Sequence, residues 1–362
     1  MKVSISKNDL STAFQYVART VNVSKNAVDA AYKGIQFVFK NNNLFLYTCD
    51  GNHFCRAYYG STEMEDFSFV VEYDLISKLV YLAKEDILLL DIQENSIFLK
   101  DGKSRYKMQY MTLIDYSYMF TNIDSEKVYI TTLKHESFNK ALSFLKQSLP
   151  KQENFKHLNG IYFDGMFVVT NIVGLAIYPY TDMISNSIFI SLESFQILSN
   201  VLQEQNSEVM LCNYKDNFIA ESGKNTYLLK CMTDSFPNYK PIVSRIDNHP
   251  YKAVIKVNDL RIACKKLVSF TNPIRNNSGK FCFYTDRLII TAASENKMGE
   301  ETIQIETDGI IQEIYIFINL ARLIILISHI KEKEIIITFS KSLKEYVIKN
   351  GDAVYIEGTL PF

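Results

Sequence analysis

The order of apolar and polar segments repeats three times along the chain, and this repeat restricts the fold more than any single motif does. Each third opens with a short strand and an amphipathic helix whose apolar side chains recur at i, i+3 or i+4, and i+7. A glycine (Gly34, Gly160 or Gly279) then starts two apolar runs parted by a polar turn, which predicts a β-hairpin. A second strand and a second helix follow. In the second and third copies, Ser191 and Asn319 stand just before this helix, where such residues cap. The repeat predicts an α+β fold in which each third packs two helices on antiparallel sheets.

The spacing of the three glycines sets the size of the repeat. The spacing is 126 residues from Gly34 to Gly160 and 119 residues from Gly160 to Gly279. Polar stretches at 124–126 and 247–250 separate the copies, and the second contains a proline. We therefore expect three domains, at residues 1–125, 126–247 and 248–362.

Length and composition favour a soluble protein of more than one domain. A chain of 362 residues exceeds what one core usually holds, and its 47% hydrophobic and 22% charged residues are typical of globular proteins. No apolar run reaches the roughly 18 residues needed to span a membrane, because Arg322 interrupts the longest one. We expect a cytoplasmic protein without a membrane partner.

Six scattered cysteines and five dispersed histidines offer no pattern typical of catalysis or metal binding. The cysteines lie mostly beside apolar residues, which predicts buried free thiols. Cys49, His53 and Cys55 could be imagined as ligands, but no second pair with zinc spacing exists in the sequence. There is no phosphate-binding glycine loop and no nucleophile motif. We expect no catalytic residue, no metal and no cofactor.

Positive charge gathers on the first helical segment of each third. Residues 7–25 carry a net charge of +2, residues 134–151 carry +3, and residues 256–275 carry +4. The whole chain carries −1, so everything outside these segments carries −10. On a helical wheel the basic side chains lie opposite the apolar stripes. Three equivalent basic faces predict one shared anionic ligand, and a nucleic-acid backbone contacted without sequence readout fits best.

Three stretches of the sequence resemble the bacterial DNA polymerase III beta subunit, the sliding clamp. HLNGIYF from His157 is similar to an L-N-G segment of that family, and DSFPNYKPIV from Asp234 is similar to its F-P-D-Y-R-x-V motif. The helix and strands from Asn258 and from Leu288 follow the corresponding family segments in order. The resemblance covers essentially the whole chain, and the F-P-x-Y motif is its most specific part.

The resemblance implies a non-enzymatic processivity factor. In that family two three-domain subunits join head to tail into a ring, helices line the hole, and duplex DNA slides through it without sequence-specific contacts. The implied partners are double-stranded DNA, the replicative polymerase, the clamp loader and other proteins that carry a clamp-binding motif. The residues expected to face DNA are Arg19, Lys25, Lys140, Lys146, Lys151, Gln152, Lys156, Arg261, Lys265 and Lys266.

The resemblance also implies an apolar pocket for partner peptides and an interface between two subunits. Apolar side chains around a groove are what a peptide anchor requires. The subunit interface would involve Tyr106, Met108 and Phe270. The positions that match the pocket are Leu158, Thr170, Leu175, Pro237, Pro241, Ile242, Ile356, Leu360 and Phe362.

The pocket positions depart from the family pattern in three places. Asn171-Ile172-Val173-Gly174 replaces the usual Asp-Gly-His-Arg, Pro241 stands where a basic residue is common, and the chain ends Leu360-Pro361-Phe362. These changes remove charged and imidazole groups, so we expect the pocket to prefer a different peptide. The sequence does not identify those peptides, the source of the gene or the affinity of the dimer.

Two other functions compete with this interpretation. An enzyme with a cleft between domains would carry a cluster of polar groups outside the repeat, and the sequence has none. A monomeric relative of the clamp could instead act as a peptide-binding adaptor, and the mass in solution distinguishes it from a dimer.

Overall fold

The structure is a computed structural model, and it describes residues 1–21, 30–112, 114–145, 148, 158–171, 173–180, 184, 186–205 and 208–360, without the side chains of 30, 31, 204, 205 and 275. These residues form two compact units. Unit 1 holds residues 1–135 and 190–231, and unit 2 holds residues 136–189 and 232–362.

The predicted repeat is confirmed in the order of the elements. Three times the chain runs through a strand, a helix, four strands, a second helix and three strands, with the short α3 and α6 between the copies and β21 added in the third. The strands of the first copy are β1 (Lys2–Ser6), β2 (Gly34–Lys40), β3 (Asn43–Cys49), β4 (Phe54–Ser61), β5 (Phe67–Glu72), β6 (Ile87–Ile92), β7 (Ser96–Asp101) and β8 (Ser104–Gln109). Those of the second are β9 (Val128–Lys134), β10 (Gly160–Phe163), β11 (Met166–Thr170), β12 (Gly174–Pro179), β13 (Ile188–Ser191), β14 (Glu208–Tyr214), β15 (Asn217–Ser222) and β16 (Asn225–Lys230). Those of the third are β17 (Tyr251–Lys256), β18 (Ser278–Phe283), β19 (Arg287–Ser294), β20 (Lys297–Gln304), β21 (Glu306–Asp308), β22 (Ile314–Asn319), β23 (Glu334–Phe339), β24 (Glu345–Asn350) and β25 (Ala353–Gly358).

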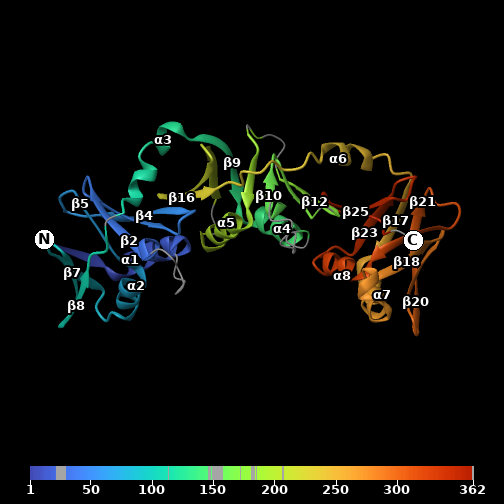
Figure 1. The fold of residues 1–362 in the computed structure, drawn as a ribbon, viewed down its shortest axis with the longest axis horizontal. Coiled ribbons are helices and arrows are strands. Elements are labelled where there is room, and N and C mark those ends of the chain that lie inside the picture. Colours follow the sequence, from blue (N-terminus) through green and yellow to red (C-terminus); the bar gives the residue numbers. More distant parts are fainter. Residues whose placement is uncertain are drawn as a thin grey trace. The chain divides into compact units, whose positions relative to one another are not determined.

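The helices are amphipathic and lie against the sheets (Figure 1). In unit 1 α1 packs beside α2, and in unit 2 α7 packs beside α8. Asn319 caps α8 as predicted, because its side chain accepts a hydrogen bond from the Arg322 N–H at 2.9 Å. The helices are α1 (Lys7–Val17), α2 (Tyr73–Leu82), α3 (Ile123–Glu126), α4 (His135–Leu145), α5 (Leu192–Gln205), α6 (Lys240–Ile246), α7 (Val257–Leu267) and α8 (Leu320–Ser328).

Each unit contains one long antiparallel sheet that joins strands from two copies of the repeat. In unit 1 the strand order is β5-β2-β3-β4-β16-β15-β14-β9. In unit 2 it is β13-β10-β11-β12-β25-β24-β23-β17-β21. The joints are the β4–β16 pair and the β12–β25 pair. A shorter sheet accompanies each, β1-β6-β7-β8 in unit 1 and β20-β19-β18-β22 in unit 2.

Aromatic rings and aliphatic side chains fill the space between helices and sheets. In unit 1 Phe14 of α1 meets Phe37 of β2 edge to face at 6.4 Å, and Phe37 stacks on Phe69 at 4.9 Å. In unit 2 α7 buries Leu260 and Leu267. Burying one such side chain contributes roughly 2–3 kcal/mol of transfer free energy, so these stripes hold the helices to the sheets.

Candidate functional site

A small apolar cavity of about 180 Å³ lies on unit 2, at the outer end of the β12–β25 joint. One wall is the β11–β12 turn, a second is the segment that leads into α6, and the third comes from the end of β25. Its lining residues are Thr170, Val173, Gly174, Leu175, Phe236, Pro237, Asn238, Tyr239, Ile242, Arg245, Lys344, Glu345, Ile356, Glu357 and Gly358.

The β11–β12 turn has a shape that requires glycine at position 174. The Asn171 side chain accepts a hydrogen bond from the Gly174 N–H at 2.8 Å, and the Thr170 hydroxyl donates to the Gly174 carbonyl at 3.0 Å. A Cβ at position 174 would lie 2.8 Å from the Tyr355 hydroxyl oxygen, closer than real Cβ contacts. Glycine therefore lets β12 approach β25, and the pocket forms where they meet.

The Phe-Pro-x-Tyr motif forms the second wall. Phe236 stacks on Tyr162 at 4.9 Å, and the Tyr239 hydroxyl donates to the Asp164 carboxylate at 2.9 Å. Burial, followed by the bond to Asp164, raises the pKa of Tyr239 above its usual range, so the hydroxyl stays protonated. These contacts hold the segment in place and leave Pro237 at the pocket surface.

A buried carboxylate, Glu357, lies beneath the pocket. Its side chain accepts hydrogen bonds from the Tyr346 hydroxyl at 2.6 Å and the Tyr355 hydroxyl at 3.0 Å, and it forms an ion pair with Arg322. Burial, followed by the charge of Glu357, raises the pKa of both tyrosines well above the usual range. The carboxylate is thus fully engaged and serves to hold β25, while the pocket above it remains apolar.

Of the eight predicted pocket residues that the structure describes, it brings five together. Thr170, Leu175, Pro237, Ile242 and Ile356 line the pocket.

The remaining pocket predictions fall elsewhere. Leu158 is buried, with 2% of its side chain exposed, and Pro241 is exposed on α6; neither lines the cavity. Leu360 donates its N–H to the Phe317 carbonyl and lines a larger cavity over β18 and β19, so the expectation that it contributes to this pocket is not met in the structure. Phe362 lies outside the described residues. Phe236 and Tyr239 line the pocket but were not expected there, although their motif was visible in the sequence.

The basic residues predicted to face DNA differ in their exposure and in their ion pairs. Lys265 and Lys266 are exposed on α7, and Lys266 pairs with Glu301 at 2.9 Å. Lys140 is exposed on α4 and pairs with Glu136 at 2.9 Å. Lys25, Lys146, Lys151, Gln152 and Lys156 lie outside the described residues.

The two arginines predicted to face DNA form hydrogen bonds within the protein. Arg261 is half-buried, and its guanidinium donates to the carbonyls of Ile327 and Ile330 at the end of α8, at 3.0 and 3.2 Å. Arg19 is half-buried as well and donates to the Tyr227 hydroxyl at 3.0 Å. The helical wheel could not predict these contacts, because the acceptors are distant in sequence.

The residues expected at a subunit interface lie on or beside two edge strands. On β8 the Tyr106 side chain is exposed and that of Met108 is buried. Phe270 is half-buried and its ring packs against Gly299 of β20. The sequence analysis did not single out Ile274 and Met298, although 90% and 69% of their side chains are exposed.

The cysteines are free thiols, as predicted, and all but the half-buried Cys231 are buried. Burial raises the pKa of Cys49 and of Cys264 to about 12, so neither is a ready nucleophile near neutral pH. No helix among the described residues is long and apolar enough to cross a membrane.

Solved structures similar to this chain match it along its whole length. The DNA polymerase III beta subunit of Thermotoga maritima matches with a TM-score of 0.77 at 18% identity, covering 100% of this chain and 99% of its own. The sliding clamp of Pseudomonas aeruginosa with a ligand matches with a TM-score of 0.81 at 18% identity, covering 100% of both chains. This chain has the sliding clamp fold.

The sequence has diverged far from the clamps of known structure. A griselimycin-bound sliding clamp from Pseudomonas aeruginosa also covers 100% of both chains, with a TM-score of 0.78 and 17% identity. No family model matches the sequence, and no curated protein matches it. The clamp fold is therefore present here with few of the residues that those matched clamps carry.

Proposed function

We propose that this protein is a DNA sliding clamp, a non-enzymatic processivity factor that encircles duplex DNA and tethers a replicative polymerase. The observation that carries the proposal is the clamp fold, matched over the whole chain with the threefold element order intact. A ring retains DNA by topology, so it needs no strong phosphate affinity, which fits a net charge of −1. The three domains proposed within it are residues 1–125, 126–247 and 248–362, and the proposed compartment is the cytoplasm.

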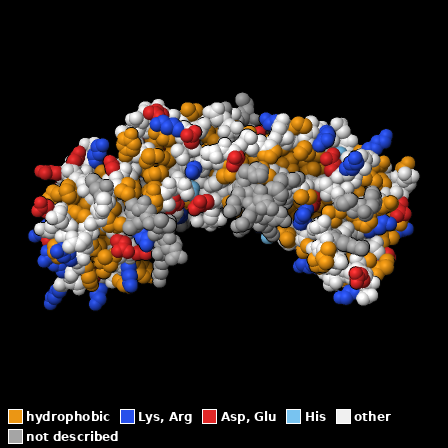
Figure 2. Space-filling view, viewed as in Figure 1, with side chains coloured by type: hydrophobic (Ala, Val, Ile, Leu, Met, Phe, Trp, Pro, Cys, Tyr) orange, Lys and Arg blue, Asp and Glu red, His pale blue; other side chains and the backbone are white. Residues whose placement is uncertain are grey.

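The ring would be a homodimer that joins the edge strand β8 of one copy to β20 of the other. Arg105 and Lys107 are exposed on β8, which carries no acidic residue. Glu300 is exposed on β20, next to the half-buried Glu301. Figure 2 shows Lys and Arg side chains gathered at the end of unit 1 where Figure 1 places β7 and β8. The positive charge of β8 and the acidic residues of β20, each at the edge of a sheet, support this pairing. Tyr106 and Phe270 would lie on or beside the joined strands.

The DNA-facing surface would be formed by the first helix of each copy. Lys140, Lys265 and Lys266 are the exposed described residues that support it. Arg261 and Arg19, bound to carbonyls and a hydroxyl of their own unit, would act there mainly by positive potential. Lys25, Lys146, Lys151, Gln152 and Lys156 complete the proposed surface.

The apolar cavity of unit 2 would bind a short linear peptide of the polymerase, the clamp loader or another clamp partner. Its apolar side chains, among them Leu175, Pro237 and Ile242, support this use. Arg245 and Lys344 are cations among the described lining residues and would favour an acidic residue in the peptide, although Arg245 also lies 4.0 Å from the Glu345 carboxylate. Leu158, Pro241 and Leu360 do not line the cavity, and any role for them would require the peptide to reach beyond it. Phe362, outside the described residues, stays a proposed contact.

A monomeric peptide-binding adaptor is the second candidate. The cavity is complete within unit 2, so peptide binding does not require a ring. Light scattering separates the two functions, because a ring has twice the 41.8 kDa mass of the chain and an adaptor has that mass once.

The decisive experiment is primer extension on a long circular template with the polymerase and clamp loader of the same organism. The protein should lengthen the products, and replacing Lys140, Lys265 and Lys266 together with Glu should abolish this while the circular-dichroism spectrum stays unchanged. Reversing the exposed Lys40, Lys252 and Lys341, which lie on no helix and on neither β8 nor β20, is the matched control and should leave product length unchanged. Products that are short with wild-type protein, or equally long with the triple variant, would contradict the proposal.

A further inference from the structure

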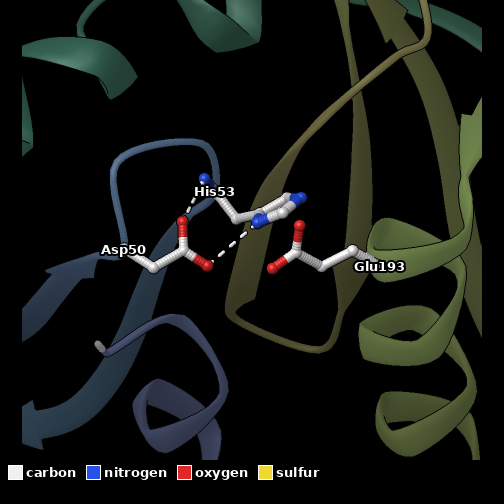
Figure 3. Close-up of side chains that lie close together, drawn as sticks. All are labelled: Asp50, His53 and Glu193. Atoms are coloured by element: carbon white, nitrogen blue, oxygen red, sulfur yellow. Dashed lines mark hydrogen bonds and ion pairs between the residues drawn. The ribbon is translucent and has the colours of Figure 1, made fainter. Parts of the chain in front are cut away.

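Three ligand-forming side chains meet in unit 1, away from the pocket. Asp50 and His53 lie in the turn between β3 and β4, and Glu193 lies in the first turn of α5, 140 positions further along the chain (Figure 3). One ligand atom of each lies within 4.8 Å of the other two. The His53 side chain is 1% exposed and that of Asp50 is 16% exposed, whereas Glu193 faces solvent.

The hydrogen bonds of Ser194 determine which nitrogen of His53 carries hydrogen. The Ser194 hydroxyl donates to the Lys230 carbonyl at 2.9 Å, and a carbonyl can only accept. The same oxygen accepts from the Ser191 hydroxyl at 2.9 Å. Its contact with His53 Nε2, also 2.9 Å, must therefore be a bond that the imidazole donates. Nε2 thus bears a hydrogen.

The other nitrogen of His53 then faces negative charge. Nδ1 lies 2.9 Å from Oδ2 of Asp50, and the Glu193 carboxylate points toward the same side of the ring (Figure 3). Oδ1 of Asp50 is occupied by the N–H groups of Asn52 and His53, at 2.8 Å each, so Oδ2 is held toward the ring. A lone pair on Nδ1 would repel these oxygens. The position between Nδ1 and Oδ2, 2.9 Å apart, is therefore one that either a hydrogen or a metal ion can occupy.

We propose that Asp50, His53 and Glu193 bind one Zn²⁺ ion, through Oδ2, Nδ1 and a carboxylate oxygen. Two ligands with bonds of about 2.1 Å to a tetrahedral ion stand about 3.4 Å apart, so the 2.9 Å contact of Nδ1 and Oδ2 would open by about 0.5 Å on binding. An imidazole with two carboxylates suits zinc better than Mg²⁺ or Ca²⁺, which take oxygen ligands. Water completes the coordination on the exposed side of Glu193. Ser194 holds the imidazole from behind, as outer-shell partners of zinc ligands commonly do.

The ion would act as a structural clip at the β4–β16 joint. His53 immediately precedes β4, and Lys230, which accepts from Ser194, is the last residue of β16. The clip ties the β3–β4 turn to the start of α5, and its effect is on the stability of unit 1. It does not depend on the proposed clamp function, and none of its ligands belongs to the pocket or the basic helices.

Calorimetric titration of the full chain, dialysed against a chelator and then against buffer, tests the site with ZnSO₄ as the probe. We expect one ion per chain, and buffers of different ionisation enthalpy measure the protons that binding releases. Glu193→Gln should weaken binding by about tenfold or more and remove the rise in thermal midpoint that Zn²⁺ causes. MgCl₂ should cause no such rise.

Asp74→Asn is the matched control. Asp74 holds the same place in the first turn of α2, so this variant loses a similar helix-terminal charge without touching the cluster. Its Zn²⁺ affinity should equal that of the wild type. Equal binding by wild type and Glu193→Gln, or no saturable binding up to about 1 mM Zn²⁺, would overturn the proposal and leave His53 as a hydrogen-bond partner of Asp50 and Ser194.

Discussion

Strands at equivalent places in the repeat differ in whether a neighbouring copy pairs with them. In the first two copies, β4 and β12 are covered by the last strands of the following copies, β16 and β25. In the third copy β20 takes the place of β4 and β12, and in the first copy β8 takes the place of β16 and β25. Within the described part of the chain, β8 and β20 each end a sheet.

The paired joints carry buried side chains, whereas the open strands β8 and β20 carry charged ones. The closed joints bury Cys55, Tyr227 and Tyr355. The open strands carry Arg105 and Lys107 on one and Lys297, Glu300 and Glu301 on the other. Charged side chains prevent open sheet edges from pairing non-specifically with other strands. Opposite charges on two edges still allow those two edges to pair. The open strands thus carry the opposite charges on which the proposed homodimer depends.

The largest expected difference is in thiol chemistry at the closed β4–β16 joint. Burial raises the pKa of Cys55 to about 12, so near pH 8 its thiolate is about a thousandfold scarcer than that of an ordinary cysteine. Iodoacetamide should alkylate Cys55 at least that much more slowly than a cysteine placed at the exposed Thr302 of β20. The rate should rise about tenfold for each unit of pH. Mass spectrometry of peptides measures both sites, and comparable rates would show that the joint opens readily.

The second effect concerns the closed β12–β25 joint. Glu357→Ala leaves Arg322 and the hydroxyls of Tyr346 and Tyr355 without their acceptor, which should cost about 3 kcal/mol of unfolding free energy. Urea unfolding followed by circular dichroism measures the loss. Glu334→Ala, at an exposed position in the same sheet, should change stability by less than about 0.5 kcal/mol. Similar losses in the two variants would mean that the buried carboxylate does not hold β25.

The third effect concerns the open edges. Arg105→Glu with Lys107→Glu should weaken self-association by about thirtyfold, or about 2 kcal/mol, because both edges then carry negative charge. Glu300→Lys in the same chain should restore part of the loss. Sedimentation equilibrium at several salt concentrations measures the constants. Reversing the charges of the exposed Lys78 and Lys84 controls for the change in net charge. If that variant weakens self-association equally, β8 is not part of the interface.

The smallest effect is a hydrogen bond at the β4–β16 joint. The Tyr227 hydroxyl donates to the Tyr16 carbonyl at 3.2 Å and accepts from Arg19 at 3.0 Å. Tyr227→Phe should lower the unfolding free energy by about 1 kcal/mol, whereas Tyr118→Phe at a 73% exposed position should leave it unchanged. Thermal unfolding of both variants measures the difference, and equal midpoints would show that Arg19 finds another acceptor.

Much of the pocket could be predicted from the sequence, and its outer members could not. Thr170, Leu175 and Ile356 lie on strands whose pattern was readable, and Pro237 lies in a recognisable motif. Leu360 was placed by position near the end of the chain, and the structure ties its backbone to Phe317 instead. A residue beyond the last strand has no periodicity to locate it, so only its contacts can.

The helices show the same limit. Periodicity identified the buried stripe of α7, and Leu260, Ala263 and Leu267 are buried as predicted. It also grouped Arg261 with Lys265 and Lys266, yet Arg261 donates to the Ile327 carbonyl at the end of α8, 66 residues away. A helix end must find donors for its last carbonyls, and a helical wheel contains no information about a neighbouring helix.

The sequence by itself determined the threefold order of strands and helices, because local periodicity and turn residues act over a few positions. Only the tertiary structure decided which strands close on one another, where the pocket opens, and that His53 meets Glu193. These features join residues more than a hundred positions apart. Their partners are chosen by the burial and hydrogen bonding of whole sheet edges, which no local pattern records.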